Sequence, residues 1–217
     1  MSEMRTEEEQ IEAIKGWWKE NGKSLVVSIV VALAAVFGWK GWQQKQHNEA
    51  EAASISYQNL LDAVVTAVNG GESSDYATSE HLAEQLKSEF GGTEYARFAG
   101  LLMAKVAVQQ GNFEQAITEL DWVIANEPAA AMKDIALLRK ARVYRAMGEW
   151  QKGIDAAQKV TATEFESPKF ELLGDLYVQL GDRAQARDAY AQALAVAENA
   201  QGNPLLTMKF EDLQGEG

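Results

Sequence analysis

The side chains that could do chemistry are few and far apart in this 217-residue sequence. It has two histidines, His47 and His81, and no cysteine, which excludes disulfides, thiolate metal sites and a cysteine nucleophile. A lone histidine seldom has a catalytic role, and Glu7, Glu8 and Glu9 form a solvated run. The sequence contains no P-loop, dinucleotide fingerprint, zinc-protease pair or nucleophile elbow. We therefore predict a protein that is not an enzyme and needs no cofactor or metal.

Charge and composition exclude a further class, the nucleic-acid-binding proteins. The net charge is −12, and 26 of the 32 acidic residues but 15 of the 20 basic residues follow Trp42. An acidic surface repels phosphates, so we expect no nucleic acid among the partners. Hydrophobic residues make up 47 % and there are only three prolines, which favours helices around a substantial core. We predict an all-α protein.

One apolar stretch stands near the N-terminus. Residues 25–37 carry no charge, and Ser28 is their only polar side chain. A helix over residues 24–42 would measure about 28 Å, close to the hydrocarbon thickness of a bilayer. Lysines and tryptophans flank it at both ends, as they do at membrane interfaces. We predict a single transmembrane helix over residues 24–42.

A cleaved signal peptide and a buried core helix are the alternatives for this stretch. A small-x-small cleavage pattern first occurs at residues 50–52, and the 23 residues before the stretch carry six acidic side chains, unlike the start of a signal peptide. A core helix would show a polar face with a period near 3.6. We favour a retained anchor. Four basic residues precede the uncharged stretch 25–37, and two, Lys40 and Lys45, follow it closely, which predicts a cytoplasmic N-terminus.

Small side chains follow one face of the predicted membrane helix. Ser28, Ala32 and Ala35 are spaced by four and three residues, and such spacing permits the close approach of a second helix. These three residues are candidate membrane-helix contacts. The alternative is that they face only lipid.

Three glycine-centred phrases recur in the rest of the chain, at Gly111, Gly148 and Gly181. The glycines are 37 and 33 residues apart, and an amphipathic helical pattern stands on each side of every one. A period in the mid-thirties predicts stacked helix pairs. The pattern resembles the tetratricopeptide repeat, and a generic array of helical hairpins is the alternative. The third phrase matches best, with Gly174, Tyr177, Gly181, Ala186, Tyr190 and Ala193.

An array of such repeats offers a concave groove that the first helix of each repeat lines. By this resemblance, the side chains that line the groove are apolar with a few basic residues among them, whereas the rest of the chain is acidic. We predict that this groove holds an apolar or acidic polypeptide segment. The alternative is that Arg142 and Arg145 only pair with neighbouring carboxylates. The candidate groove residues are Phe98, Leu101, Lys105, Val108, Ile135, Leu138, Arg142 and Arg145.

Nearly the whole chain resembles the YfgM family. The phrases that carry this resemblance are ENGK (20–23), GWKGWQQKQ (38–46), ASISYQNLLDAV (53–64) and PLLTMKFEDL (204–213). The resemblance implies a single-pass inner-membrane protein of Gram-negative bacteria with a periplasmic repeat domain. It also implies an ancillary subunit of the SecYEG translocon that acts with the periplasmic chaperone PpiD on emerging secreted proteins. No catalytic residue and no cofactor are implied.

Four segments and one function are therefore predicted. The segments are a cytoplasmic tail (1–23), the transmembrane helix (24–42), a stem with a degenerate N-terminal repeat (43–96), and tetratricopeptide-like repeats with a C-terminal cap (97–217). We expect a turn at residues 70–75 and a partner helix from Thr78 to Phe90. The predicted function is that of a non-enzymatic adaptor or chaperone at the translocon. A scaffold for envelope assembly or stress signalling, without client binding, is the alternative.

Overall fold

A computed structural model describes residues 7–70, 73–126, 128–197 and 203–214 of the chain. The regular elements in these ranges are α-helices and one 3-10 helix, so the all-α prediction is confirmed. The chain divides into two compact units, the first ending at Glu51 and the second beginning at Ala52. Helix α1 (Glu7–Gly70) contributes residues to both units.

The apolar part of α1 lies in the first unit and is exposed along its length. Only 6 % of its most apolar window is buried, and the side chains of Val31 and Phe37 are both exposed. A core helix would be mostly buried, so that interpretation is wrong. A helix that is apolar all round and exposed suits lipid, which leaves this segment a candidate membrane span. The predicted limits at residues 24 and 42 refer to a bilayer and stay a prediction.

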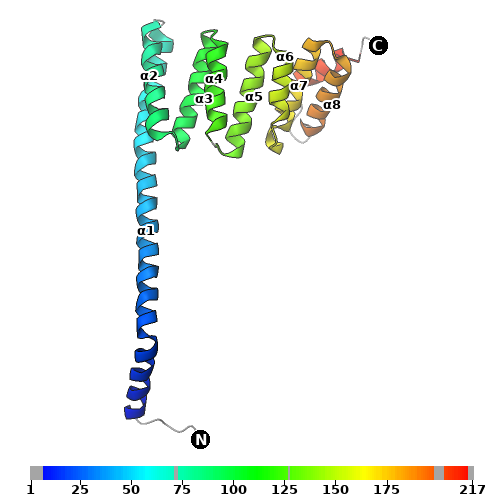
Figure 1. Ribbon diagram of the computed structural model, residues 1–217. Helices are drawn as coiled ribbons and strands as arrows, with labels where there is room; N and C mark the ends of the chain where they lie inside the picture. The colour runs from blue at the N-terminus through cyan, green and yellow to red at the C-terminus, as the bar shows by residue number, and fades with distance from the viewer. Residues whose placement is uncertain (1–6, 71–72, 127, 198–202, 215–217) are drawn as a thin grey trace. The chain divides into compact units, whose positions relative to one another are not determined.

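The second unit is built from antiparallel helices, each of which packs on the next in sequence. Figure 1 shows them standing in a row from α2 to α8. The helices after α1 are α2 (Ser73–Phe90), α3 (Glu94–Gln109), α4 (Phe113–Ala125), α5 (Ala130–Ala146), α6 (Trp150–Gln158), the 3-10 helix η1 (Thr163–Phe165), α7 (Glu166–Leu180), α8 (Arg183–Ala197) and α9 (Pro204–Asp212).

The recurring glycines end the first helix of each repeat. Gly111, Gly148 and Gly181 have φ angles of 76°, 75° and 78°, a left-handed conformation that glycine adopts at little cost. At the end of α3 the backbone N–H of Asn112 donates to the carbonyl of Ala107 (2.8 Å), and equivalent bonds close α5 and α7. These bonds satisfy carbonyls that the helix leaves unpaired. The pairs α3–α4, α5–α6 and α7–α8 are therefore the three repeats that the glycine spacing predicts.

Close contact between helices explains why small residues occupy fixed places in these repeats. A Cβ atom added to Gly174 of α7 would lie 2.3 Å from the ring of Tyr190 of α8. One added to Gly153 of α6 would lie 2.9 Å from a methyl group of Leu176. Such distances are far below van der Waals contact. The backbones of paired helices therefore approach to within the thickness of one large side chain.

The N-terminal end of the repeats is closed by residues 52–70 of α1 together with α2. Their buried side chains, among them Leu60 and Leu86, form one cluster with Ala96 of α3. Helix α2 begins at Ser73 rather than at the predicted Thr78. The predicted turn at residues 70–75 is therefore shorter than expected, and its residues 71–72 lie outside the described ranges.

The C-terminal end is closed by α9. Its N-cap is Asn203, whose side-chain oxygen accepts a hydrogen bond from the backbone N–H of Leu206 (3.3 Å). Leu206 is fully buried and clusters with Tyr190 and Ala193 of α8. Helix α9 thus covers apolar surface that the last repeat would otherwise expose, as terminal caps of repeat arrays do.

Candidate polypeptide-binding site

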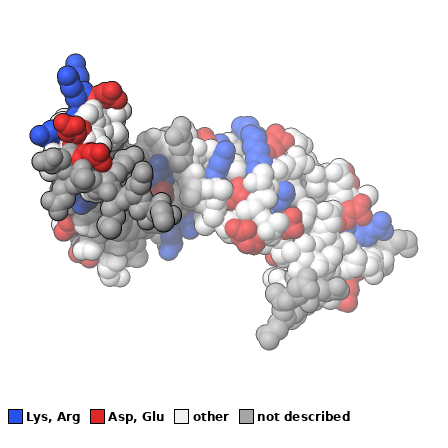
Figure 2. Space-filling view, turned by 90° about the horizontal axis from the view of Figure 1, so that it is seen from below, with Lys and Arg blue, Asp and Glu red and all other residues white. Residues whose placement is uncertain are grey.

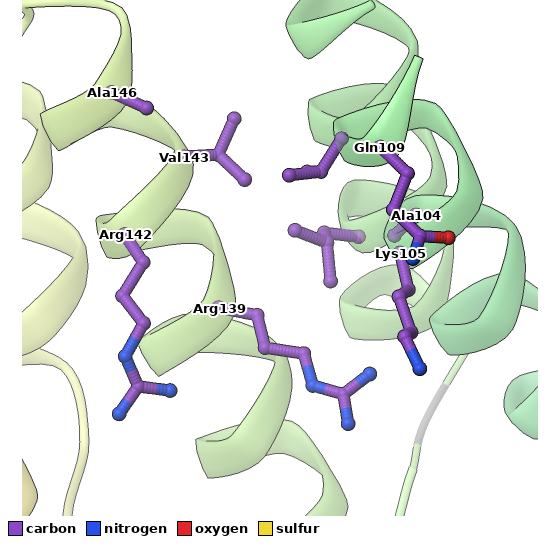
Figure 3. A pocket seen from close by; sticks show the side chains of 9 residues that line it. Ala104, Lys105, Gln109, Arg139, Arg142, Val143 and Ala146 are labelled. Carbon is purple, nitrogen blue, oxygen red and sulfur yellow. The ribbon is translucent and has the colours of Figure 1, made fainter. Parts of the chain in front are cut away.

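A pocket of about 270 Å³ lies between the first helices of two successive repeats, α3 and α5. Leu120 of α4 and Val143 of α5 give it an apolar interior. Figure 3 shows the charged ends of Lys105, Arg139 and Arg142 on one side of the pocket, with Val143 and Ala146 on the other. The complete lining is Ala104, Lys105, Val108, Gln109, Leu120, Arg139, Arg142, Val143 and Ala146.

Three of the predicted groove residues meet at this pocket. Lys105 and Val108 reach it from α3, and Arg142 reaches it from α5. Val108 is 39 % exposed although it is apolar. An apolar patch bordered by cations is therefore present where the sequence predicts a groove, and its occupant stays a prediction.

Two of the predicted groove residues belong to the core instead. Leu101 is 8 % exposed and Leu138 is 4 % exposed, and they pack in two separate clusters of buried side chains. Neither side chain can present a contact surface to a ligand, so their assignment to the groove is corrected. Ile135 is half-buried against the cluster that contains Leu101.

Phe98 lies apart from the pocket in an aromatic cluster. Its ring centroid is 6.1 Å from that of Tyr57 and 6.3 Å from that of Tyr95. Phe98 remains 40 % exposed. Aromatic side chains in this state contribute a large apolar contact area at protein interfaces, so Phe98 stays a candidate contact residue on α3.

Arg139 is the charged pocket residue that sequence reasoning missed. Its guanidinium donates a hydrogen bond to the carbonyl of Leu101 (3.1 Å), which anchors it between α5 and α3. Burial lowers the pKa of Arg139, and the positive charge of Arg142 lowers it further. The two guanidinium groups therefore repel each other. The three-residue spacing of Arg139 and Arg142, which places them on neighbouring positions of one helix surface, could have revealed the pair.

The cations at the pocket differ from several other basic residues of the second unit, which pair with carboxylates. Elsewhere in the second unit, Lys87 pairs with Glu119 (2.9 Å) and Lys140 pairs with Asp121. Within the described residues, no ion pair joins Lys105, Arg139 or Arg142 to a carboxylate. Figure 2 shows Lys and Arg side chains over the middle of the repeats on the face that it draws. The pocket is thus a positively charged place on a protein of net charge −12.

Arg145 lies one helical turn along α5 from Arg142, and it has a different environment. Its guanidinium forms an ion pair with Asp175 of α7. Asp175 also accepts hydrogen bonds from the hydroxyl of Tyr190 (2.9 Å) and from Nζ of Lys209 (2.8 Å). The carboxylate is thereby satisfied from three elements. For Arg145 the structure matches the alternative of pairing with a neighbouring carboxylate.

The charge network around Asp175 contributes to shifted pKa values of two of its partners, Tyr190 and Lys209. Burial raises the pKa of Tyr190, and the hydrogen bond to Asp175 raises it further. Burial alone would lower the pKa of Lys209, but its hydrogen bonds to Asp175 and Glu171 outweigh this and raise it. This network ties α9 to the last repeat.

The buried charged residue Asp134 has a structural explanation. Its carboxylate accepts hydrogen bonds from the backbone N–H groups of Ala162 (2.8 Å) and Thr161 (3.1 Å). Asp134 is 2 % exposed. It therefore fixes the connection between the second and third repeats rather than binding a ligand.

The candidate membrane-helix contacts lie in the first unit. Ser28 donates its hydroxyl hydrogen bond to the carbonyl of Ser24 (3.0 Å), one turn earlier in α1. This bond lets Ser28 enter lipid without a partner on another helix. Ser28, Ala32 and Ala35 are all exposed, and a role in helix contact stays a prediction.

Comparison with known proteins adds four findings. A family model described as "Tetratricopeptide repeat-like domain" matches residues 15–215. A protein of Aggregatibacter actinomycetemcomitans named "Ancillary SecYEG translocon subunit" is 30 % identical over 187 residues, 86 % of this chain and 88 % of the relative. A protein of Escherichia coli K12 with the same name is 27 % identical, over 95 % of this chain and 96 % of the relative. A solved structure of pilF from Pseudomonas aeruginosa has a TM-score of 0.56 at 17 % identity, covering 76 % of this chain and 69 % of that one, and is similar in fold alone.

Proposed function

Since this chain belongs to the tetratricopeptide repeat-like family of ancillary SecYEG translocon subunits, we propose that it is a membrane-anchored adaptor that works beside a protein translocon. The observation that carries this proposal is one exposed apolar helix joined in a single chain to a repeat array that has an apolar pocket bordered by cations. The proposed adaptor role needs no catalytic step: an apolar interior bordered by cations suits binding.

The proposed anchor is the span over residues 24–42, retained in the mature protein. Four basic residues before the uncharged stretch 25–37 and two soon after it favour a cytoplasmic N-terminus by the positive-inside rule. The repeats then stand in the periplasm of a Gram-negative cell. Ser28, Ala32 and Ala35 form the face of the span that contacts a translocon helix.

The proposed task of the repeats is to bind polypeptide at the periplasmic side of the channel. The two kinds of occupant are a partner chaperone of the PpiD type and a secreted protein as it emerges. An exposed apolar groove with cationic borders suits an extended segment of either. The competing function is a scaffold for envelope assembly that binds no client.

Co-purification tests the proposal directly. The full-length chain, solubilised in mild detergent from cells that carry a tagged translocon, is expected to co-purify with that translocon. Changing Ala32 and Ala35 to Ile should weaken co-purification because the larger side chains hold the helices apart. The matched control changes Ala34, which lies about 100° around the same helix from Ala35, to Ile. Co-purification that neither change affects, or that is absent for the unchanged chain, would contradict this mode of anchoring.

A further inference from the structure

We propose that the α3–α5 pocket recognises a polypeptide segment in which an apolar side chain is flanked by carboxylates. This inference rests on the proposed function and names the chemistry of the segment that the repeats would bind. The inference concerns the α3–α5 pocket alone and not the rest of the groove. The charge, the shape and the position of the pocket each support this inference.

Charge comes first. Lys105, Arg139 and Arg142 border one pocket, and within the described residues none of them pairs with a carboxylate. Like charges held together in a fold cost free energy, and a bound anion would offset that cost. Because the guanidinium of Arg139 is already fixed by the Leu101 carbonyl, it is oriented before any ligand arrives. Charge complementarity therefore favours an acidic partner.

Shape comes second. The pocket holds about 270 Å³ and its interior is formed by aliphatic groups, including Leu120 and Val143. Sites for drug-sized ligands or cofactors measure roughly 300–1,000 Å³, so this pocket suits one or two side chains. A simple anion would leave the apolar interior in contact with water. The apolar interior and the cationic border together fit a Leu or a similar side chain with acidic neighbours.

Position comes third. The pocket lies between the first helices of two successive repeats, on the side where repeat arrays bind extended segments. Val108 at its border is exposed, so a segment can pass over the pocket and insert one side chain. The next inter-helix position along the array also has a pocket, of about 370 Å³, but there Asp175 already neutralises Arg145 and Lys209. The cations of that position are therefore not available to an acidic ligand.

A binding measurement with defined peptides tests the inference. The probe is a fluorescein-labelled, end-capped peptide with the central sequence Gly-Asp-Leu-Glu-Gly, added to the full-length protein in detergent and followed by fluorescence anisotropy. Two comparison peptides carry Gly-Asn-Leu-Gln-Gly and Gly-Asp-Ala-Glu-Gly. We expect each comparison peptide to bind at least about fivefold more weakly, since one lacks the charges and the other the apolar anchor.

Variants of the protein locate the binding. The double variant Lys105→Gln with Arg142→Gln should weaken binding of the acidic peptide about tenfold. The control variant Lys133→Gln with Lys159→Gln removes the same charge from exposed positions that do not line the pocket, and should bind as the unchanged protein does. Reversing the charges with Lys105→Glu and Arg142→Glu should transfer the preference to a Gly-Lys-Leu-Lys-Gly peptide. That gain of binding cannot come from an unfolded variant.

Several results would overturn the inference. One is equal binding of the acidic and amide peptides. Another is displacement of the peptide by millimolar inorganic phosphate alone, which would indicate a general anion site. A third is equal weakening by the control variant. If the peptides fail to discriminate while the chain still co-purifies with the translocon, the pocket assignment is wrong and the proposed function stands. If the protein discriminates between the peptides but does not co-purify with the translocon, the proposed function is wrong and the pocket assignment stands.

Discussion

Two successive inter-helix positions of the repeat array hold similar basic residues and treat them differently. Between α3 and α5, Lys105 and Arg142 border an apolar pocket, and no ion pair in the described part of the chain engages them. Between α5 and α7, Arg145 pairs with Asp175, which Tyr190 and Lys209 also contact. The residue that faces a cation from the next repeat therefore decides whether that cation stabilises the fold or remains available to a ligand.

The largest expected effect concerns the packing of Tyr190, the residue of α8 that contacts Asp175 at the paired position. Changing Gly174 to Ala places a Cβ atom 2.3 Å from the ring of Tyr190, and relieving this overlap should cost about 3 kcal/mol of unfolding free energy. Urea unfolding followed by far-ultraviolet circular dichroism measures it. Gly92→Ala is the control, because a Cβ atom there meets nothing within 4 Å. Equal stability of the two variants would contradict the packing that we describe.

The next effect concerns the central carboxylate of the paired position. Asp175→Ala leaves Arg145 and Lys209 without this partner and removes the acceptor of the Tyr190 hydroxyl. We expect a loss of about 2 kcal/mol in unfolding free energy. Asp155→Ala, at an exposed residue, should cost less than about 0.5 kcal/mol. An equal loss of unfolding free energy in both variants would show that the network around Asp175 does not stabilise the fold.

The network should also make stability depend on alkaline pH. The pKa values of Tyr190 and Lys209 are both raised in the folded state. A group with a raised folded pKa stabilises the fold below its unfolded pKa, and this contribution is lost as the pH rises through the folded pKa. The urea midpoint should therefore fall as the pH rises above about 10, the ordinary pKa of both groups. The Tyr190→Phe variant with Lys209→Gln should show a shallower fall, and an unchanged slope would contradict the network.

The smallest effect on stability is expected at the open position. Lys105→Gln together with Arg142→Gln removes no ion pair within the described residues, so unfolding free energy should change by less than about 0.5 kcal/mol. Removing like charges would tend to stabilise rather than destabilise. The same unfolding measurement checks it, and a loss above about 1.5 kcal/mol would show that these side chains support the fold.

Much of the fold could be predicted because it is encoded over short distances. The glycine that ends each first helix must adopt positive φ, so its spacing reveals the repeat. The all-α fold is confirmed, and the resemblance to the YfgM family is confirmed by relatives of 22–30 % identity over most of the chain. Exposure along the apolar part of α1 likewise excludes a core helix.

The groove could be predicted only in part because burial depends on residues far away in the sequence. Helical spacing placed Lys105 and Arg142 correctly at one pocket. It could not show that Leu101 is covered by α5, or that Arg145 meets Asp175, 30 residues away. The spacing of Arg139 and Arg142 could have revealed that the two lie together, but not the hydrogen bond of Arg139 to a backbone carbonyl 38 residues earlier, which no pattern of residue types reveals.

The central claim is that the repeat array engages polypeptide at the α3–α5 position rather than along its whole length. Val108 and Val178 allow a matched test, because they occupy the same place in the first and third repeats and are 39 % and 40 % exposed. The measurement is photo-crosslinking in living cells from p-benzoylphenylalanine at one position or the other, with products identified by mass spectrometry. We predict crosslinks from position 108 to a periplasmic chaperone or an emerging secreted chain, and few crosslinks from position 178. The crosslinks from position 108 should be lost when Lys105→Gln and Arg142→Gln are combined. Equal crosslinking from both positions, or none from position 108, would contradict it.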